Sequence, residues 1–211
     1  MGARLAQLVM GLLLYGFTMA LMVQSGLGLD PWDVFHEGLT HHVPLTFGQV
    51  VIAVGAIVLL LWIPLKQRPG VGTVLNVLLI GLAADAGIAL VAVPEEMWAR
   101  VALLVVGVVG NGLAGALYIG ARLGTGPRDG LWVALVARTG LSVRRVRTGI
   151  EITVLATGFL LGGTVGLGTV LYALAIGPLV QFFLERVPDS ARPASSENAS
   201  QEPRDAAVYV V

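Results

Sequence analysis

The chain has 211 residues, of which 56% are hydrophobic and only 12% are charged, and its mean hydropathy is +0.84. Such a composition is typical of an integral membrane protein, for which the lipid bilayer is the first partner, and not of a soluble domain. The net charge of zero argues against nucleic acid as a partner. Because the chain has no cysteine, it offers neither a disulfide framework nor a thiolate metal site.

Six apolar segments approach the length of about 20 residues that a helix needs to cross a bilayer. The first resembles a signal peptide because Arg4 precedes its apolar stretch, but an equivalent segment beginning at Arg100 is internal, so we interpret it as a retained helix. The sequence therefore predicts an all-α membrane protein with six transmembrane helices. The segments cover residues 5–24, 46–64, 72–93, 100–120, 146–163 and 167–185.

The sequence repeats itself, without a gap, at an offset of 96 residues. Residues 27–33 and 123–129 share the pattern Leu-Gly-x-x-Pro-x-Asp, and residues 70–75 and 166–171 share Gly-x-Gly-Thr-Val-Leu. A duplicated membrane unit constrains the topology and therefore the place of a site.

We assign repeat 1 to residues 1–96 and repeat 2 to residues 97–187, with three crossings each. Three is an odd number, so the second repeat should enter the membrane with the opposite orientation, which makes this an inverted repeat. Residues 188–211 are rich in Ser, Asn, Glu and Pro, and this composition predicts a disordered cytoplasmic tail.

The distribution of basic residues supports this topology. With a cytoplasmic N-terminus, Arg100 is the one residue among the 13 Lys and Arg that falls outside the cell. We therefore expect a multi-pass protein of the bacterial cytoplasmic membrane with both termini in the cytoplasm.

Each repeat has a short helix after its first crossing, predicted at residues 31–43 and 127–139. The shared glycines permit a sharp turn, the prolines suit a first helical position, and the aspartates lie in the first helical turn. Helices of this length cannot span a bilayer, so they are either re-entrant or interfacial, and the apolar second copy favours a re-entrant position. The turn residues are Gly28, Pro31, Gly124 and Pro127.

Polar residues at these turns and inside the crossings are the candidates for a substrate or ion site. An acid within a crossing is costly and usually faces a cavity or a partner, although for Asp85 we favour a structural hydrogen-bonded acid or a position near the outer interface. Arg128 could serve an anion at a helix N-terminus or could extend to the cytoplasmic headgroups. A further alternative is that the turns have only a structural role, as tight turns of the backbone. The candidate residues are Asp30, Asp33, Arg128, Asp129 and Asp85.

Metal binding and catalysis find little support. Asp33, His36 and Glu37 are followed by His41 and His42, but the set matches no specific ligand pattern, and an exposed outer segment accounts for it. The chain has no nucleophile elbow, phosphate loop or zinc-protease motif, so we predict neither an enzyme nor a cofactor. Elsewhere, Arg147 and Glu151 have the spacing of an ion pair on one helix face.

The paired turn motif, followed by Gly-x-Gly-Thr-Val-Leu and Ile-Gly, resembles the YczE/YyaS/YitT group of bacterial integral membrane proteins over nearly all of residues 1–187. The resemblance implies a compact polytopic protein of the cytoplasmic membrane, and no catalytic or ligand-binding residue accompanies it.

Two functions fit these features. The first is a transporter or permease for a small polar or anionic solute, with its site between the two Pro-x-Asp half-helices. The second is a scaffold that supports a partner complex. Small residues at 112, 116 and 120 and at 158 and 162 permit close helix packing, within the bundle or in a homo-oligomer.

Overall fold

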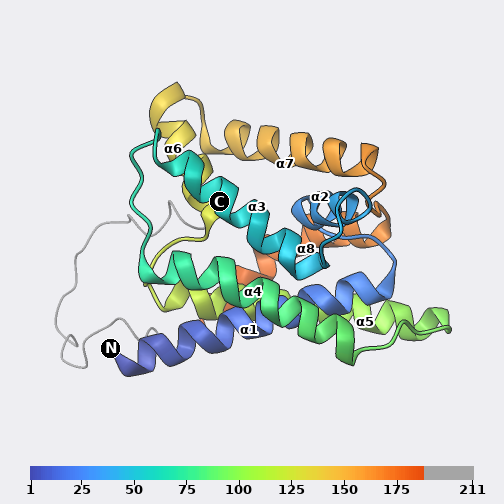
Figure 1. Ribbon diagram of the computed structural model, residues 1–211. Coiled ribbons are helices and arrows are strands. Elements are labelled where there is room, and N and C mark those ends of the chain that lie inside the picture. The colour runs from blue at the N-terminus through green and yellow to red at the C-terminus, as the bar shows by residue number, and fades with distance from the viewer. Residues whose placement is uncertain (188–211) are drawn as a thin grey trace.

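A computed structural model describes residues 1–187 of the chain, and the tail predicted at residues 188–211 lies outside the described residues. Within this range the chain forms eight α-helices and no strand, which confirms the all-α class (Figure 1). In chain order these are α1 (Gly2–Ser25), α2 (Pro31–Thr40), α3 (Phe47–Trp62), α4 (Val71–Leu90), α5 (Met97–Gly120), α6 (Pro127–Thr139), α7 (Val143–Leu160) and α8 (Leu167–Leu184).

Four helices in this range, α1, α4, α5 and α8, are long and apolar enough to cross a membrane. The helix α3 is apolar but has only 16 residues, and α7 has 18 residues but begins with several arginines. Large apolar side chains face outward on these helices; Leu174 of α8, for example, is 73% exposed. An apolar outer surface of this kind suits contact with lipid.

The helix boundaries follow the sequence signals closely. Both short helices begin at a proline, and the Asp30 carboxylate caps α2 by accepting hydrogen bonds from the next backbone N–H groups. The prediction that the first short helix extends to residue 43 was wrong, because α2 ends at Thr40. A turn then uses the backbone N–H of residues 41–43, and Pro44, whose preceding residue disfavours helical backbone, follows at once.

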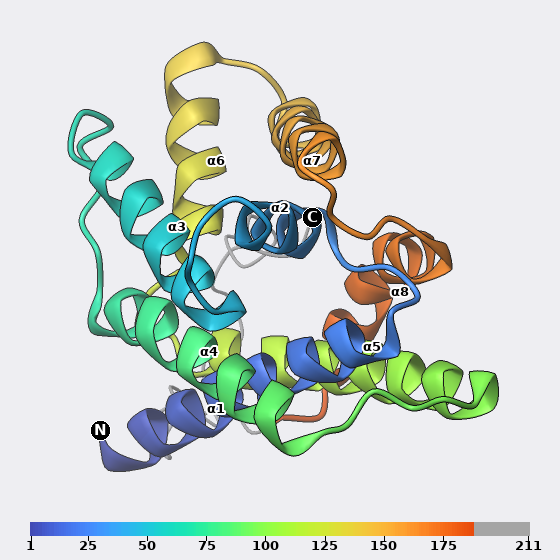
Figure 2. The same cartoon turned by 45° about the vertical axis from the view of Figure 1, so that its right-hand side comes forward.

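The helix packing follows the sequence repeat. The long helices α1 and α5 pack on each other, and each also packs on the last helix of its own repeat, α4 or α8. The short helices cross over, since α2 packs on α7 and α6 packs on α3. Figure 2 shows α2 near the centre of the molecule, with α3, α6, α7 and α8 around it.

The two most strongly repeated motifs bind each other across the repeats. The Gly72 N–H donates to the Leu123 carbonyl at 2.9 Å, and the equivalent Gly168 N–H donates to the Leu27 carbonyl at 2.8 Å. At the adjoining turns, Gly28 (φ 111°) and Gly124 (φ 137°) have backbone conformations that favour glycine. The start of α4 is therefore hydrogen-bonded to the turn before α6. In the same way, the start of α8 is hydrogen-bonded to the turn before α2.

Candidate functional site

The acidic turn at the start of α2 is buried in the middle of the protein. Asp30 Oδ1 accepts hydrogen bonds from the Trp32 N–H at 2.8 Å and from the Asp33 N–H at 3.2 Å. Asp33 Oδ1 lies 3.0 Å from His36 Nδ1, which must be the donor when the carboxylate is ionised. The predicted first-turn position of Asp33 is confirmed, but its carboxylate faces His36, while Asp30 caps the helix.

Arg128 extends from the first turn of α6 to this acidic turn. Its guanidinium nitrogens lie 3.9 Å from Asp30 Oδ1 and 3.7 Å from Asp33 Oδ1. The guanidinium carbon lies 5.0 Å from the centre of the Trp32 ring, within the range of a cation–π contact. Three sequence-predicted residues, Asp30, Asp33 and Arg128, thus meet in one place, and the fourth, Asp129, follows Arg128 in the chain and lines the same cavity as Asp30. We call residues 30, 33, 128 and 129 the acidic cluster.

Two oxygens of the acidic cluster are unsatisfied. Among the described residues, neither Asp30 Oδ2 nor Asp33 Oδ2 has a hydrogen-bond partner, although both atoms are buried. Asp30 precedes α2, outside the four long apolar helices, and its pKa is raised to about 7, first by burial and then by the charge of Asp33. Arg128 opposes this rise. A buried acceptor without a donor is costly, so the arrangement is suited to a ligand that supplies one.

Aromatic hydroxyls complete the surroundings of the acidic cluster. The Tyr118 hydroxyl donates to Asp129 Oδ2 at 2.7 Å, and the Tyr172 hydroxyl donates to Asn111 Oδ1 at 2.9 Å. The Tyr15 hydroxyl lies 3.4 Å from that of Tyr172. None of these residues was predicted as a site residue. Tyr172 stands at the repeat position of Asn76, 96 residues earlier, and this difference between the repeats could have pointed to it.

A cavity of about 780 Å³ opens beside the acidic cluster. Asp30, Trp32, Arg128 and Asp129 line it, and Asp33 does not. On the opposite side of Trp32 and Arg128 lies a smaller cavity of about 90 Å³, lined by α3 and α4. Both cavities share Tyr15, Trp32, Tyr118, Arg128 and Asp129 as wall residues, so these side chains separate a large space from a small one.

The difference in size follows from a difference between the repeats. In repeat 1, α3 packs along α4, whereas the equivalent α7 and α8 lie apart. A Cβ atom at Gly81 of α4 would collide with the Gly48 carbonyl and with Ile52 of α3. At the equivalent Gly177 of α8 it would meet no described atom within 4 Å, and Gly177 lines the large cavity. The protein is therefore closed between α3 and α4 and open between α7 and α8.

Comparison with known proteins fits this architecture. Residues 2–185 match a family model described as "Family of unknown function (DUF6198)". Over 176 residues the chain is 34% identical to the uncharacterized membrane protein YczE of Bacillus subtilis, covering 82% of each chain. The chain belongs to this YczE-like family.

Two further relatives extend the YczE-like family in this comparison. A Haemophilus influenzae protein, named only as uncharacterized, is 42% identical over 177 residues, covering 84% of this chain and 81% of its own. The Bacillus subtilis protein YyaS is 24% identical over 178 residues, covering 82% of this chain and 89% of its own. No solved structure matches the chain. The membership establishes a YczE/YyaS-like membrane protein and carries no activity with it.

Asp85 lies apart from the acidic cluster of this YczE-like protein. Its carboxylate accepts a hydrogen bond from the Gly48 N–H at 2.7 Å and another from the Thr46 hydroxyl, at the start of α3. The structure therefore places Asp85 where it joins α4 to the first turn of α3, which is the structural alternative considered from the sequence. Asp85 therefore belongs to the contact between α3 and α4, where the protein is closed.

The histidines do not form a metal centre in the described part of the chain, which contains no group of three or more potential ligands. The expectation that they lie in an exposed outer segment was wrong for His36, which is only 1% exposed because α2 lies in the interior. The ring of His42 lies 3.2 Å from the Leu161 carbonyl, so it joins α2 to the end of α7.

Charged and small residues elsewhere mostly serve packing. The predicted pair of Arg147 and Glu151 is confirmed at 2.9 Å, and both residues line the large cavity. The small residues face helices of the same chain, since Gly112 packs on Leu179 of α8 and Gly158 packs on the backbone of α2 near Phe35. These faces are therefore used within the protein.

Proposed function

We propose that the protein transports a small polar solute across the bacterial cytoplasmic membrane, with its site at the acidic cluster between the two short helices. The observation that carries this proposal is the cavity of about 780 Å³, whose wall contains Asp30, Trp32, Arg128 and Asp129. A scaffold needs no such space beside buried and unsatisfied carboxylates. Paired broken elements at the interface of two repeats are the usual place of a transporter site.

The unequal repeats supply a mechanism for transport. Transporters built from two equivalent halves alternate between two states in which the halves exchange their conformations. In this protein the closed pair α3 and α4 would open, and the open pair α7 and α8 would close. The acidic cluster would then face the other side of the membrane, while Trp32 and Arg128 remain between the two cavities.

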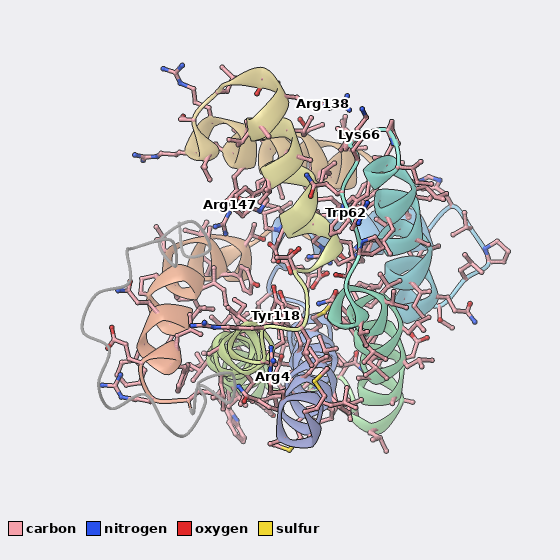
Figure 3. The ribbon with its side chains drawn as sticks, turned by 90° about the vertical axis from the view of Figure 1, so that its left-hand side faces the viewer. Arg4, Trp62, Lys66, Tyr118, Arg138 and Arg147 are labelled. Carbon is pink, nitrogen blue, oxygen red and sulfur yellow. The ribbon has the colours of Figure 1, made fainter. Side chains whose placement is uncertain are left out.

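The basic residues suggest which side the large cavity faces. Arg4, Lys66, Arg138 and Arg147 lie toward the end of the molecule that faces the viewer in Figure 3. The large cavity extends toward the same end, where Leu184 and Val187 line it. Because basic residues favour the cytoplasmic side, we assign this end to the cytoplasm and the open state to the inward-facing one. Six crossings, with α3 and α7 included, complete this topology.

Solute flux in proteoliposomes tests the proposal. Purified protein is reconstituted, and uptake is measured across a panel of small amines, carboxylates and neutral polar solutes. We expect uptake of at least one class, and we expect Asp33→Asn and Asp129→Asn to reduce it strongly while the protein stays folded. Absence of flux for every solute, together with stable binding to a partner protein, would favour the scaffold.

A further inference from the structure

We propose that the acidic cluster binds the protonated amine of a small solute, with Asp30 as the acceptor of its N–H groups. This inference rests on the proposed function, since it names the solute class for the same site. It differs from the expectation of an anionic solute, which depended on Arg128 as a free positive charge. Three independent features of the cluster support the amine.

The first feature is the need for donors. Asp30 Oδ2 and Asp33 Oδ2 are buried, and within residues 1–187 nothing donates a hydrogen bond to either atom. Asp30 is 3% exposed and lines the large cavity, so of the two acids it is the one that adjoins the space a solute would enter. A carboxylate accepts hydrogen bonds and cannot donate them, so a ligand that satisfies this oxygen must bring an N–H or O–H group.

The second feature is the charge of the cluster. Two carboxylates, Asp30 and Asp33, lie 3.9 and 3.7 Å from the guanidinium of Arg128, and Asp129 is a third acid in the same cluster. Elsewhere in the cavity wall, Glu151 is paired with Arg147, and Arg122 is a further basic residue. A bound cation would bring the cluster closer to neutrality, whereas an anion beside Arg128 would also meet the carboxylates at 3.7–3.9 Å from it.

The third feature is the shape and lining of the space. Tyr15, Trp32, Tyr118, Trp132 and Tyr172 all line the large cavity. Aromatic faces stabilise an organic cation and its apolar substituents, and they are poor ligands for a hard metal ion. The volume of about 780 Å³ accommodates an organic molecule. We therefore assign the site to an organic amine.

Binding to the full-length purified protein in detergent tests this assignment. Three probes share one aromatic body: phenethylamine, its N,N,N-trimethyl analogue and 3-phenylpropionate. The change in thermal unfolding temperature and in tryptophan fluorescence is measured against concentration. We expect phenethylamine to bind about tenfold or more tightly than the trimethyl analogue, which has no N–H to donate, and we expect no binding of the carboxylate.

Asp30→Asn tests the acceptor, and Asp33→Asn tests the buried charge next to it. Asparagine at residue 30 retains an oxygen that can cap α2, so the variant should fold. We expect Asp30→Asn to lose the preference for phenethylamine over the trimethyl analogue, and we expect Asp33→Asn to weaken the binding of both cations. Glu95→Gln, which removes an exposed acid between α4 and α5, is the matched control and should bind like the original protein.

The comparison of the three probes remains decisive even if neither variant folds. Stronger binding of 3-phenylpropionate, equal binding of the amine and its trimethyl analogue, or binding of none of the three would each overturn the assignment. Binding of phenethylamine without flux in proteoliposomes would support the amine site and contradict transport, so the two proposals fail separately.

Discussion

Trp32 and Arg128 occupy equivalent positions of the sequence repeat, 96 residues apart, and they stack on each other with 5.0 Å between the guanidinium carbon and the ring centre. Contact between equivalent positions is expected where two matching halves meet at a shared axis. The repeat places an indole on one half and a guanidinium on the other, so this contact is a cation–π pair and not a pair of like residues. This stacked pair forms part of the wall between the two cavities.

Arg128→Gln should destabilise the protein, because it removes the cation beside two buried carboxylates. The loss should be about 2 kcal/mol, less than that for a fully buried and hydrogen-bonded pair, since the arginine is partly exposed and its nitrogens are more than 3.5 Å from the acids. Thermal unfolding in detergent measures this loss of stability. Adding Asp33→Asn should recover part of the loss, and strictly additive losses would show that the charges do not interact.

Gly28→Ala should weaken the contact between the repeats. A Cβ atom at Gly28 would lie 2.6 Å from the Gly166 nitrogen, and its φ of 111° disfavours any other residue. Strain and overlap together should cost more than about 2 kcal/mol in the free energy of unfolding. The control is Gly177→Ala, which has room in the open state and should be neutral or slightly stabilising. Equal effects of the two variants would contradict the described packing.

Pairs of cysteines should report the unequal repeats, and the chain has no cysteine of its own to interfere. A Cβ atom at Gly55 would lie 3.6 Å from the Val77 Cβ, so Gly55→Cys with Val77→Cys should form a disulfide in the described state. The equivalent pair in repeat 2 is Glu151→Cys with Ala173→Cys. It should cross-link slowly, because α7 and α8 lie apart.

Solute should change these cross-linking rates if the repeats exchange conformations. We expect a transported solute to speed the repeat 2 disulfide and to slow the repeat 1 disulfide, as read by mobility shift on gels. Rates that are identical in the two repeats, or that solute leaves unchanged, would contradict the exchange.

Amine binding should depend on pH near neutrality. Burial raises the pKa of Asp30 to about 7, with Asp33 adding to the rise and with Arg128 and His36 opposing it; the Tyr15 hydroxyl also lies in the cavity wall. The carboxylate is charged above this pKa and neutral below it, so affinity for phenethylamine should fall as the pH drops from 8 to 6. Asp30→Asn should bind weakly at both values, and a constant affinity for the original protein would show that Asp30 does not take part.

Much of the fold is encoded locally and could be predicted. The apolar segments, the prolines at residues 31 and 127 and the Gly-x-Gly-Thr helix starts fix where helices begin, because each acts within a few residues. The 96-residue repeat also predicts that the two halves have the same arrangement of helices. The end of α2 at Thr40 was misplaced, since the backbone turn that stops it depends on hydrogen bonds that the hydrophobic pattern does not show.

The site was only partly predictable. Asp30, Asp33, Arg128 and Asp129 were found because they stand at helix starts, where the chemistry is local. Their meeting depends on α2 and α6 crossing to the opposite repeat, which no local pattern specifies. Asp85 had the same sequence features as a site acid, and only tertiary packing directs it to the start of α3. The opening between α7 and α8 is likewise a property of long-range packing, absent from the sequence repeat.

Transport by alternation between the repeats is tested most directly by phenethylamine uptake into proteoliposomes that contain either the original protein or Gly177→Leu. A Cβ atom at residue 177 meets no described atom within 4 Å, so a leucine there extends into the open space that α7 needs to close on α8. Alternation between the repeats predicts that the original protein transports the amine and that Gly177→Leu does not, even at amine concentrations that saturate its own binding. Uptake by Gly177→Leu at the original rate, or no uptake by the original protein despite binding, would contradict it.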